Sequence, residues 1–172
     1  AEVKKLKIGN GLDEGVNFGP LIDGNAMKKM KIFVDDAKEK GGTIIHGGEK
    51  IDDYFFQPTV ITNANKKMKF AQEEIFGPIA PMFRFKTEKE AIQMANDTVF
   101  GLASYLYTND LNRSIRVSEA LEYGMVGLNA GLISTEVAPF GGVKQSGQGR
   151  EGSIYGLDDF VSLKYVCTGN VK

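Results

Sequence analysis

The chain has little of several residue types: no tryptophan, one cysteine, one histidine and five prolines among 172 residues. The single cysteine, Cys167, cannot form a disulfide within the chain, which is typical of a protein in a reducing, cytoplasmic compartment. One cysteine and one histidine (His46) also exclude most metal sites built from those two ligands. We therefore expect a cytoplasmic protein with no internal disulfide and no metal site.

The chain also lacks an excess of positive or negative charge, and it lacks long apolar runs. The formal net charge is −1, which gives no electrostatic footprint for nucleic acid or for an anionic membrane surface. No apolar run approaches the length of about 20 residues that a membrane span needs. We therefore expect neither nucleic acid nor a membrane as a partner.

Short apolar runs alternate with stretches of helical periodicity along the chain. Apolar residues recur every three or four positions over 25–40, and this pattern predicts a helix that Gly41-Gly42 ends. Thr87–Glu90 fits a capping box, and Asp110 can cap a further helix. The expected strands lie at 43–45, 55–62, 83–85, 104–108 and 125–129. Strands that alternate with helices predict an open α/β sheet.

The two ends differ from this pattern. Residues 1–8 are typical of the tail of an amphipathic helix without its cap, so we expect the chain to be a piece of a longer protein. Residues 160–167 (FVSLKYVC) place alternate apolar side chains on one face. A bare apolar edge strand favours aggregation, so this segment is expected to pair with another chain.

A glycine-rich segment covers residues 131–153, and its residues 147–152 spell G-x-G-x-x-G. A dinucleotide fingerprint needs a buried strand before it, a helix after it and an acidic residue about twenty positions on. Residues 143–146 (VKQS) are not a buried strand, and Gly156 would break a following helix. The string is therefore interpreted as a structural turn rather than a phosphate cradle.

Three further positions invite two interpretations each. Cys167 suits a small buried apolar side chain better than a nucleophile, and His46 beside two glycines suits a turn. Glu73-Glu74 precedes Ile-Phe-Gly-Pro, so these acids could be a solvated helix end. Alternatively, Glu74 and Phe76 could present a carboxylate and a ring on a rigid turn, where they would meet ribose hydroxyls and a flat heterocycle.

Several motifs carry a resemblance that covers the chain in order. It resembles the C-terminal part of the aldehyde dehydrogenase superfamily and is most similar to succinate-semialdehyde dehydrogenases. The motifs are FGPLI (18–22), YFFQPTV (54–60), EEIFGP (73–78), NDTVFGLASYLYT (96–108), GLIS (131–134), APFGGVKQSGQGREGS (138–153) and GREGSIYGLDDFVSLKYVC (149–167). The resemblance implies a three-layer, mostly parallel open α/β sheet. It assigns residues 1–155 to the catalytic domain and residues 156–172 to a C-terminal oligomerisation strand.

The resemblance also implies NAD or NADP as cofactor, a small aldehyde as substrate and a homo-oligomer. Glu74 matches the glutamate that binds the nicotinamide ribose, and Phe76 matches the aromatic residue beside the nicotinamide. Ser134 matches the serine that hydrogen-bonds the distal carboxylate of succinate semialdehyde, although it could simply cap its loop. Phe140 matches the aromatic residue that lines the aldehyde tunnel.

No catalytic residue is assigned within the chain. The family's nucleophilic cysteine, general-base glutamate and oxyanion asparagine have no counterpart here and would precede Ala1, so the chain alone is expected to be inactive. Two alternatives stay open. The parent could oxidise another aldehyde, or the chain could be a non-catalytic assembly module that exchanges its last strand.

Overall fold

The computed structural model describes residues 2–170, which form two compact units. The first unit ends at Phe85 and the second begins at Lys86, and each is described by itself. This division differs from the expected boundary at residues 155/156, which stays a prediction. No helix among residues 2–170 is long and apolar enough to cross a membrane.

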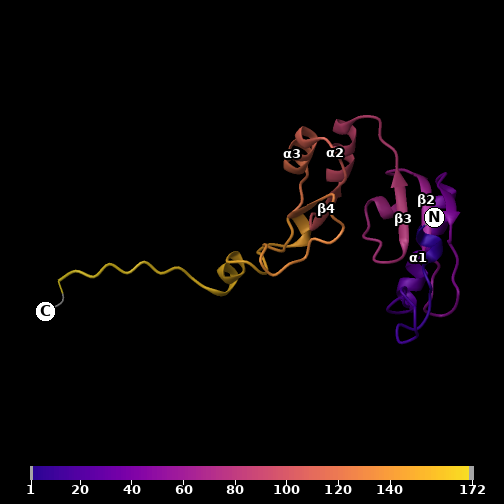
Figure 1. Ribbon diagram of the computed structural model, residues 1–172, viewed down its shortest axis with the longest axis horizontal. Helices are drawn as coiled ribbons and strands as arrows, with labels where there is room; N and C mark the ends of the chain where they lie inside the picture. The colour runs from indigo at the N-terminus through magenta and orange to yellow at the C-terminus, as the bar shows by residue number, and fades with distance from the viewer. Residues whose placement is uncertain (1, 171–172) are drawn as a thin grey trace. The chain divides into compact units, whose positions relative to one another are not determined.

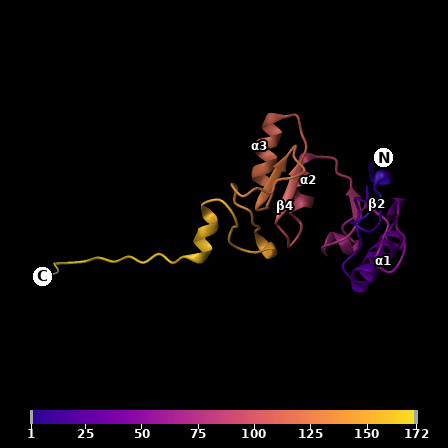
Figure 2. The same cartoon turned by 60° about the horizontal axis from the view of Figure 1, so that its bottom comes forward.

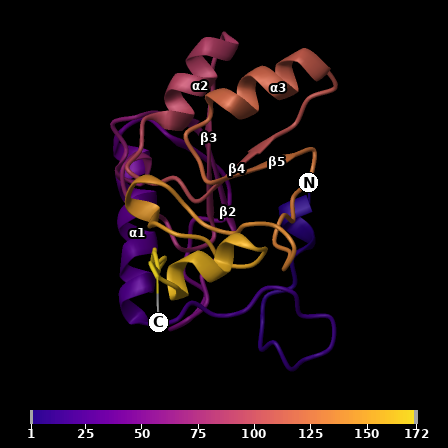
Figure 3. The ribbon, with the colours of Figure 1, turned by 90° about the vertical axis from the view of Figure 1, so that its left-hand side faces the viewer.

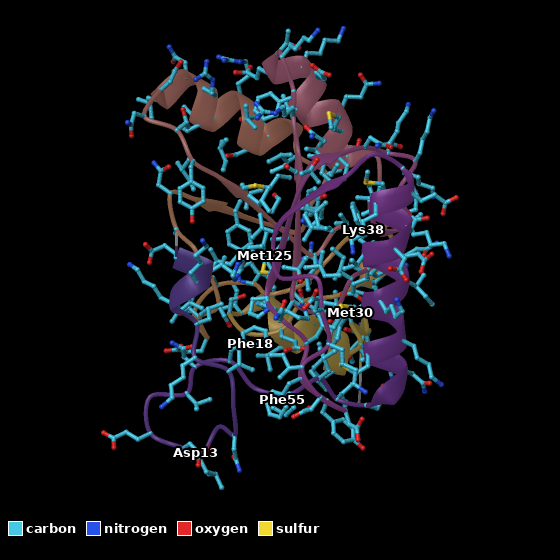
Figure 4. All side chains as sticks on the ribbon, turned by 90° about the vertical axis from the view of Figure 1, so that its right-hand side faces the viewer. Asp13, Phe18, Met30, Lys38, Phe55 and Met125 are labelled. Carbon is cyan, nitrogen blue, oxygen red and sulfur yellow. The ribbon has the colours of Figure 1, made fainter. Side chains whose placement is uncertain are left out.

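The first unit is a helix packed on a three-stranded sheet (Figure 1). The strands lie in the order β1-β2-β3, with β1 antiparallel and β3 parallel to the central strand β2. The elements are the 3-10 helix η1 (Glu2–Lys5), α1 (Gly24–Glu39), β1 (Thr43–His46), β2 (Thr59–Ala64), the 3-10 helix η2 (Lys69–Ala71) and β3 (Ile79–Phe83). Between η1 and α1 a loop carries the exposed Asp13 at its far end (Figure 4).

The apolar face of α1 supplies half of the buried residues in the core of the first unit. Met30, Phe33 and Ala37 are fully buried there because spacings of three and four residues place them on one side of the helix. They pack with Ile61 of β2 and with Phe70, whose ring meets that of Phe33 edge to face at a centroid distance of 6.2 Å. The core therefore holds α1, the sheet and η2 together.

The second unit contains two parallel strands joined through a helix. α3 (Leu111–Ala120) connects β4 (Ala103–Leu106) with β5 (Met125–Leu128), and α2 (Glu88–Asn96) packs beside α3 (Figures 2 and 3). Two short 3-10 helices follow, η3 (Lys144–Ser146) and η4 (Tyr155–Phe160). Two of the three strand pairings in residues 2–170 are parallel and belong to two small open sheets, which confirms the predicted α/β class with mostly parallel strands.

The predicted caps are confirmed. The Thr87 hydroxyl accepts a hydrogen bond from the Glu90 amide at 3.1 Å, and an Asp110 carboxylate oxygen accepts one from the Arg113 amide at 3.0 Å. The expected strand at 83–85 is displaced, because β3 begins at Ile79 and includes a proline. A proline is tolerated there because β3 is an edge strand.

The last segment is extended and unpaired in this isolated chain. Residues 161–170 are exposed and belong to no strand, so the expected oligomerisation strand stays a prediction (Figure 1). Leu163 and Tyr165 are almost completely exposed, with 103% and 89% of their reference area. Cys167 is exposed as well, so the expectation of a buried thiol is wrong for the chain by itself. The expected helix tail at residues 1–8 is only the 3-10 turn η1.

An ion cluster joins the two helices of the second unit. The Glu88 carboxylate on α2 accepts hydrogen bonds from the Nε atoms of Arg113 and Arg116 on α3, at 2.9 and 2.8 Å. These two guanidinium groups lower the pKa of Glu88 from 4.5 to about 2.

This shift predicts a pH-dependent contribution to stability. A lowered folded-state pKa means that the contribution is complete above about pH 4.5 and is lost as the pH falls towards 2. Urea unfolding followed by circular dichroism measures the free energy of unfolding. This free energy should be larger for the wild type than for Glu88→Gln at pH 7, and the difference should shrink as the pH falls from 4.5 to 2. Glu119→Gln on the exposed side of α3 is the control. A difference between wild type and Glu88→Gln that does not vary with pH would contradict the prediction.

Candidate functional site

A turn between η2 and β3 carries Glu74 and Phe76. The Lys29 ammonium donates a hydrogen bond to the Glu74 carbonyl oxygen, and the Thr59 amide donates one to the Pro78 carbonyl oxygen at 2.7 Å. Ile75, between the two candidate residues, packs against the core. The turn is therefore anchored from α1, from β2 and from its own centre.

The backbone of this turn directs both side chains outward. Phe76 has a φ of 45°, a left-handed conformation that is uncommon for a residue other than glycine, and its side chain is 78% exposed. Gly77 follows, and a Cβ there would collide with the end of the Met30 side chain, so a larger residue would require the buried Met30 to move. A large apolar ring on a fixed turn has no packing role within the described residues.

Glu74 has the features that the functional interpretation needs. Its side chain is exposed, and its carboxylate forms no hydrogen bond or ion pair with any residue of the described range 2–170. The helix-end interpretation does not hold, because η2 ends at Ala71 and Glu74 follows in irregular backbone. A free carboxylate can accept two hydroxyl hydrogens, and a ring two residues on can cover a flat heterocycle.

The second pair of candidates lies on the loop after β5, in the other unit. Ser134 is exposed, and its hydroxyl forms no hydrogen bond with residues 2–170. Phe140 is half-buried, and its backbone exchanges two hydrogen bonds with Glu151, at 2.8 and 2.7 Å. The loop begins at the carboxyl end of a parallel strand, the end where open α/β sheets bind ligands.

The G-x-G-x-x-G string is a structural turn, as predicted. The 3-10 helix η3, and not a strand, directly precedes it, and among residues up to 170 only the 3-10 helix η4 follows it. Its three glycines have φ values of 112° (Gly147), 77° (Gly149) and 66° (Gly152), which other residues rarely adopt. A Cβ on Gly149 would also collide with the Asp159 carboxylate. The glycines thus shape the backbone instead of approaching a phosphate.

Two basic side chains stabilise this loop by binding backbone carbonyl oxygens. The sequence analysis did not single out either of them. An Arg150 guanidinium nitrogen, Nη1, donates to the carbonyl oxygens of Gly142 at 2.9 Å and Gly149 at 2.6 Å. The Lys144 ammonium donates to the carbonyl oxygen of Asn96 at 2.9 Å. Their only signal in the sequence is their position among the glycines, because the acceptors are backbone atoms that no residue pattern reveals.

The remaining candidates gain no partner. His46 ends β1 and is half-buried, and it forms no side-chain hydrogen bond with the described residues. No group of three or more potential metal-ligating side chains is found in the described part of the chain. The candidate binding residues are therefore two pairs, Glu74 with Phe76 and Ser134 with Phe140.

Comparison with known proteins gives a consistent result. The model of the aldehyde dehydrogenase family matches residues 1–166. A glutarate-semialdehyde dehydrogenase of Pseudomonas putida is 58% identical over 97% of this chain and 35% of its own length. A mitochondrial succinate-semialdehyde dehydrogenase of Arabidopsis thaliana is 56% identical over 99% of this chain and 33% of its own length.

The fold agrees as well. A crystal structure of an aldehyde dehydrogenase from Brucella melitensis biovar abortus is 54% identical and superposes with a TM-score of 0.95, over 99% of this chain and 35% of that one. The chain thus spans about a third of the length of the relatives that it matches. With this family match, these identities and this fold, the chain belongs to the aldehyde dehydrogenase family.

Proposed function

We propose that the parent of this chain is an NAD(P)-dependent dehydrogenase that oxidises succinate semialdehyde to succinate. The observation that carries the proposal is the loop after β5, which presents the free hydroxyl of Ser134 and the ring of Phe140. The relatives support the same substrate class, because succinate and glutarate semialdehydes both end in a carboxylate. Glutarate semialdehyde is therefore the second candidate substrate.

The cofactor of this family is a nicotinamide dinucleotide. An Escherichia coli relative is named for NADP(+), and a betaine aldehyde dehydrogenase structure from Staphylococcus aureus, 42% identical with a TM-score of 0.86, contains NAD+. In this chain Glu74 would accept hydrogen bonds from the nicotinamide ribose, and Phe76 would lie beside the nicotinamide. Their exposure and the fixed turn fit these roles. When bound, the cofactor supplies the hydride acceptor.

The residues proposed to bind the aldehyde substrate supply a hydroxyl group and an aromatic ring. A carboxylate that leaves water needs donors, and Ser134 supplies one. Phe140 is half-buried, so part of the residue stays accessible and its ring can line an apolar passage for the aldehyde chain. A 3-sulfolactaldehyde dehydrogenase is also 54% identical, so other aldehydes with an anionic far end are the alternative within this class.

The nucleophile is proposed to come from the part of the parent outside these 172 residues. Cys167 is the only thiol in the chain, and it lies exposed in a segment without helix or strand. On the basis of the motif resemblance, a Gly-Gln-x-Cys segment is proposed to precede these residues in the parent. Reading the coding sequence before Ala1 for a Gly-Gln-x-Cys segment tests this proposal. A cytoplasmic location of the parent is proposed as well.

The apolar segment 160–167 is proposed to join a second copy of the chain. Its alternate side chains Val161, Leu163 and Tyr165 are exposed, so as a strand they would cover one face of a neighbouring sheet. This pairing accommodates both the enzyme and the assembly-module interpretations. It would bury apolar surface that is left in water in the isolated chain.

Replacing Ser134 tests the substrate class. In the full-length parent, Ser134→Ala should raise KM for succinate semialdehyde by about 10- to 100-fold, because a hydrogen bond to a charged group contributes about 1.5–3 kcal/mol. KM for butanal, which has the same carbon chain without the carboxylate, should change little. Steady-state kinetics of dinucleotide reduction measure both values.

Thr135→Ala is the matched control, since it removes a neighbouring hydroxyl on the same loop. The 172-residue chain by itself is the blank and should show no aldehyde oxidation. Equal effects of Ser134→Ala on both aldehydes would reject the carboxylate role of Ser134.

Replacing Leu163 tests the strand. Proline at this position removes a backbone donor and cannot join the middle of a ladder, so Leu163→Pro should convert an oligomeric chain into monomers. Leu163→Ala keeps the backbone amide donor, so this variant should associate more strongly than Leu163→Pro. Multi-angle light scattering measures the mass of each variant, and a wild-type chain that stays monomeric at every concentration would contradict the proposed pairing.

A further inference from the structure

Lys144 occupies an unusual place in the glycine-rich loop. It follows Phe140 by four residues and begins η3 with a φ of 55°, which a lysine rarely adopts. Left-handed residues other than glycine persist where the surrounding structure fixes them, and they cluster at functional sites. The contacts of Lys144 show what fixes it.

The Lys144 ammonium is held by three oxygen atoms. It donates to the carbonyl oxygens of Asn96 at 2.9 Å and Thr98 at 3.2 Å, and it forms an ion pair with a Glu122 carboxylate oxygen at 2.6 Å. The side chain is only 25% exposed. Asn96 is the last residue of α2, and a cation is favourable there because helix C-termini carry partial negative charge.

The backbone on both sides of Lys144 is fixed to the same segment. The Val143 amide donates to the Gly101 carbonyl oxygen at 3.0 Å, and the Gln145 amide donates to the Val99 carbonyl oxygen at 2.9 Å. The Gly101 amide in turn donates to the Ser146 hydroxyl at 2.9 Å. Residues 143–146 therefore dock on the stretch between α2 and β4.

Two glycines, Gly141 and Gly142, connect Phe140 to the docked residues 143–146. A Cβ on Gly124 would collide with the Gly141 carbonyl oxygen, so the two backbones touch directly. Gly142 is buried and lies against Ser146. Phe140 is thus held between its pairing with Glu151 on one side and the docked turn on the other.

We propose that Lys144 is a positioning residue for the aldehyde passage: by binding the C-terminal end of α2 and Glu122, its ammonium fixes the turn that orients Phe140. The proposal rests on the proposed function of Phe140 and extends it to a residue that touches neither substrate nor cofactor. Lys144 acts through backbone geometry, so it should affect the fit of the aldehyde and leave the cofactor turn at Glu74 unchanged.

Kinetics of the full-length parent give the first test. Lys144→Met removes the ammonium and keeps the length of the side chain, so KM for succinate semialdehyde should rise about tenfold while KM for the dinucleotide stays the same. Glu122→Gln removes one acceptor and leaves both carbonyl contacts, so its effect should be smaller. Lys89→Met on the exposed side of α2 makes the same charge change without a contact to lose and is the control.

Amide hydrogen exchange of the 172-residue chain gives the second test, and it needs no activity. In Lys144→Met the amides of Val143 and Gln145 should exchange about tenfold faster or more, whereas the β5 amide of Val126 should keep its rate. Lys144→Gly suits the left-handed φ, so it separates backbone strain from the ammonium. It should lose the same protection as Lys144→Met.

The outcomes are distinguishable. Normal exchange in both Lys144 variants, or faster exchange with no change in aldehyde KM, would overturn the proposal and leave the proposed function intact. Recovery of protection in Lys144→Gly would also overturn it, because strain and not the ammonium would then control the turn. A parent that oxidises no semialdehyde would overturn the proposed function, and exchange would still show whether Lys144 fixes the turn.

Discussion

Several backbone carbonyl oxygens in loops and at the end of α2 accept hydrogen bonds from lysine and arginine side chains. Lys29 holds the carbonyl oxygen of Glu74, Lys144 holds those of Asn96 and Thr98, and Arg150 holds those of Gly142 and Gly149. Each of these cations fixes a segment that carries, or adjoins, a candidate site residue. Irregular backbone can therefore present Glu74 and Phe76, and Phe140, with little secondary structure of its own.

Regular elements with strong local signals were predictable. The apolar spacing of α1, the caps at Thr87 and Asp110 and the short apolar run of β5 each depend on neighbours within a few residues. The four site residues followed from the resemblance, which names positions but not conformations. The structure adds that Phe76 is left-handed and exposed.

Features set by distant groups were not predictable. The role of Lys144 depends on carbonyl oxygens some 46 to 48 residues earlier in the chain, and nothing in the local pattern reveals them. The segment 160–167 has the alternation of a strand but forms no ladder within residues 2–170, and its proposed pairing with a second chain involves a partner that its own residues do not specify. Cys167 is exposed in the same segment, so its predicted burial would occur only within the proposed pairing.

The glycine-rich loop at residues 131–153 is divided into two parts that differ in how freely they can change. From Phe140 onward, backbone pairing, glycine contacts and two cations constrain nearly every position. Before it, residues 131–137 are mostly exposed and are tied only by a few contacts, such as the Ser153 amide to the Glu136 carbonyl oxygen at 2.9 Å. The loop thus separates a fixed frame from a short stretch open to variation. Selection or protein engineering can alter the far end of the proposed aldehyde pocket there without rebuilding the frame behind it.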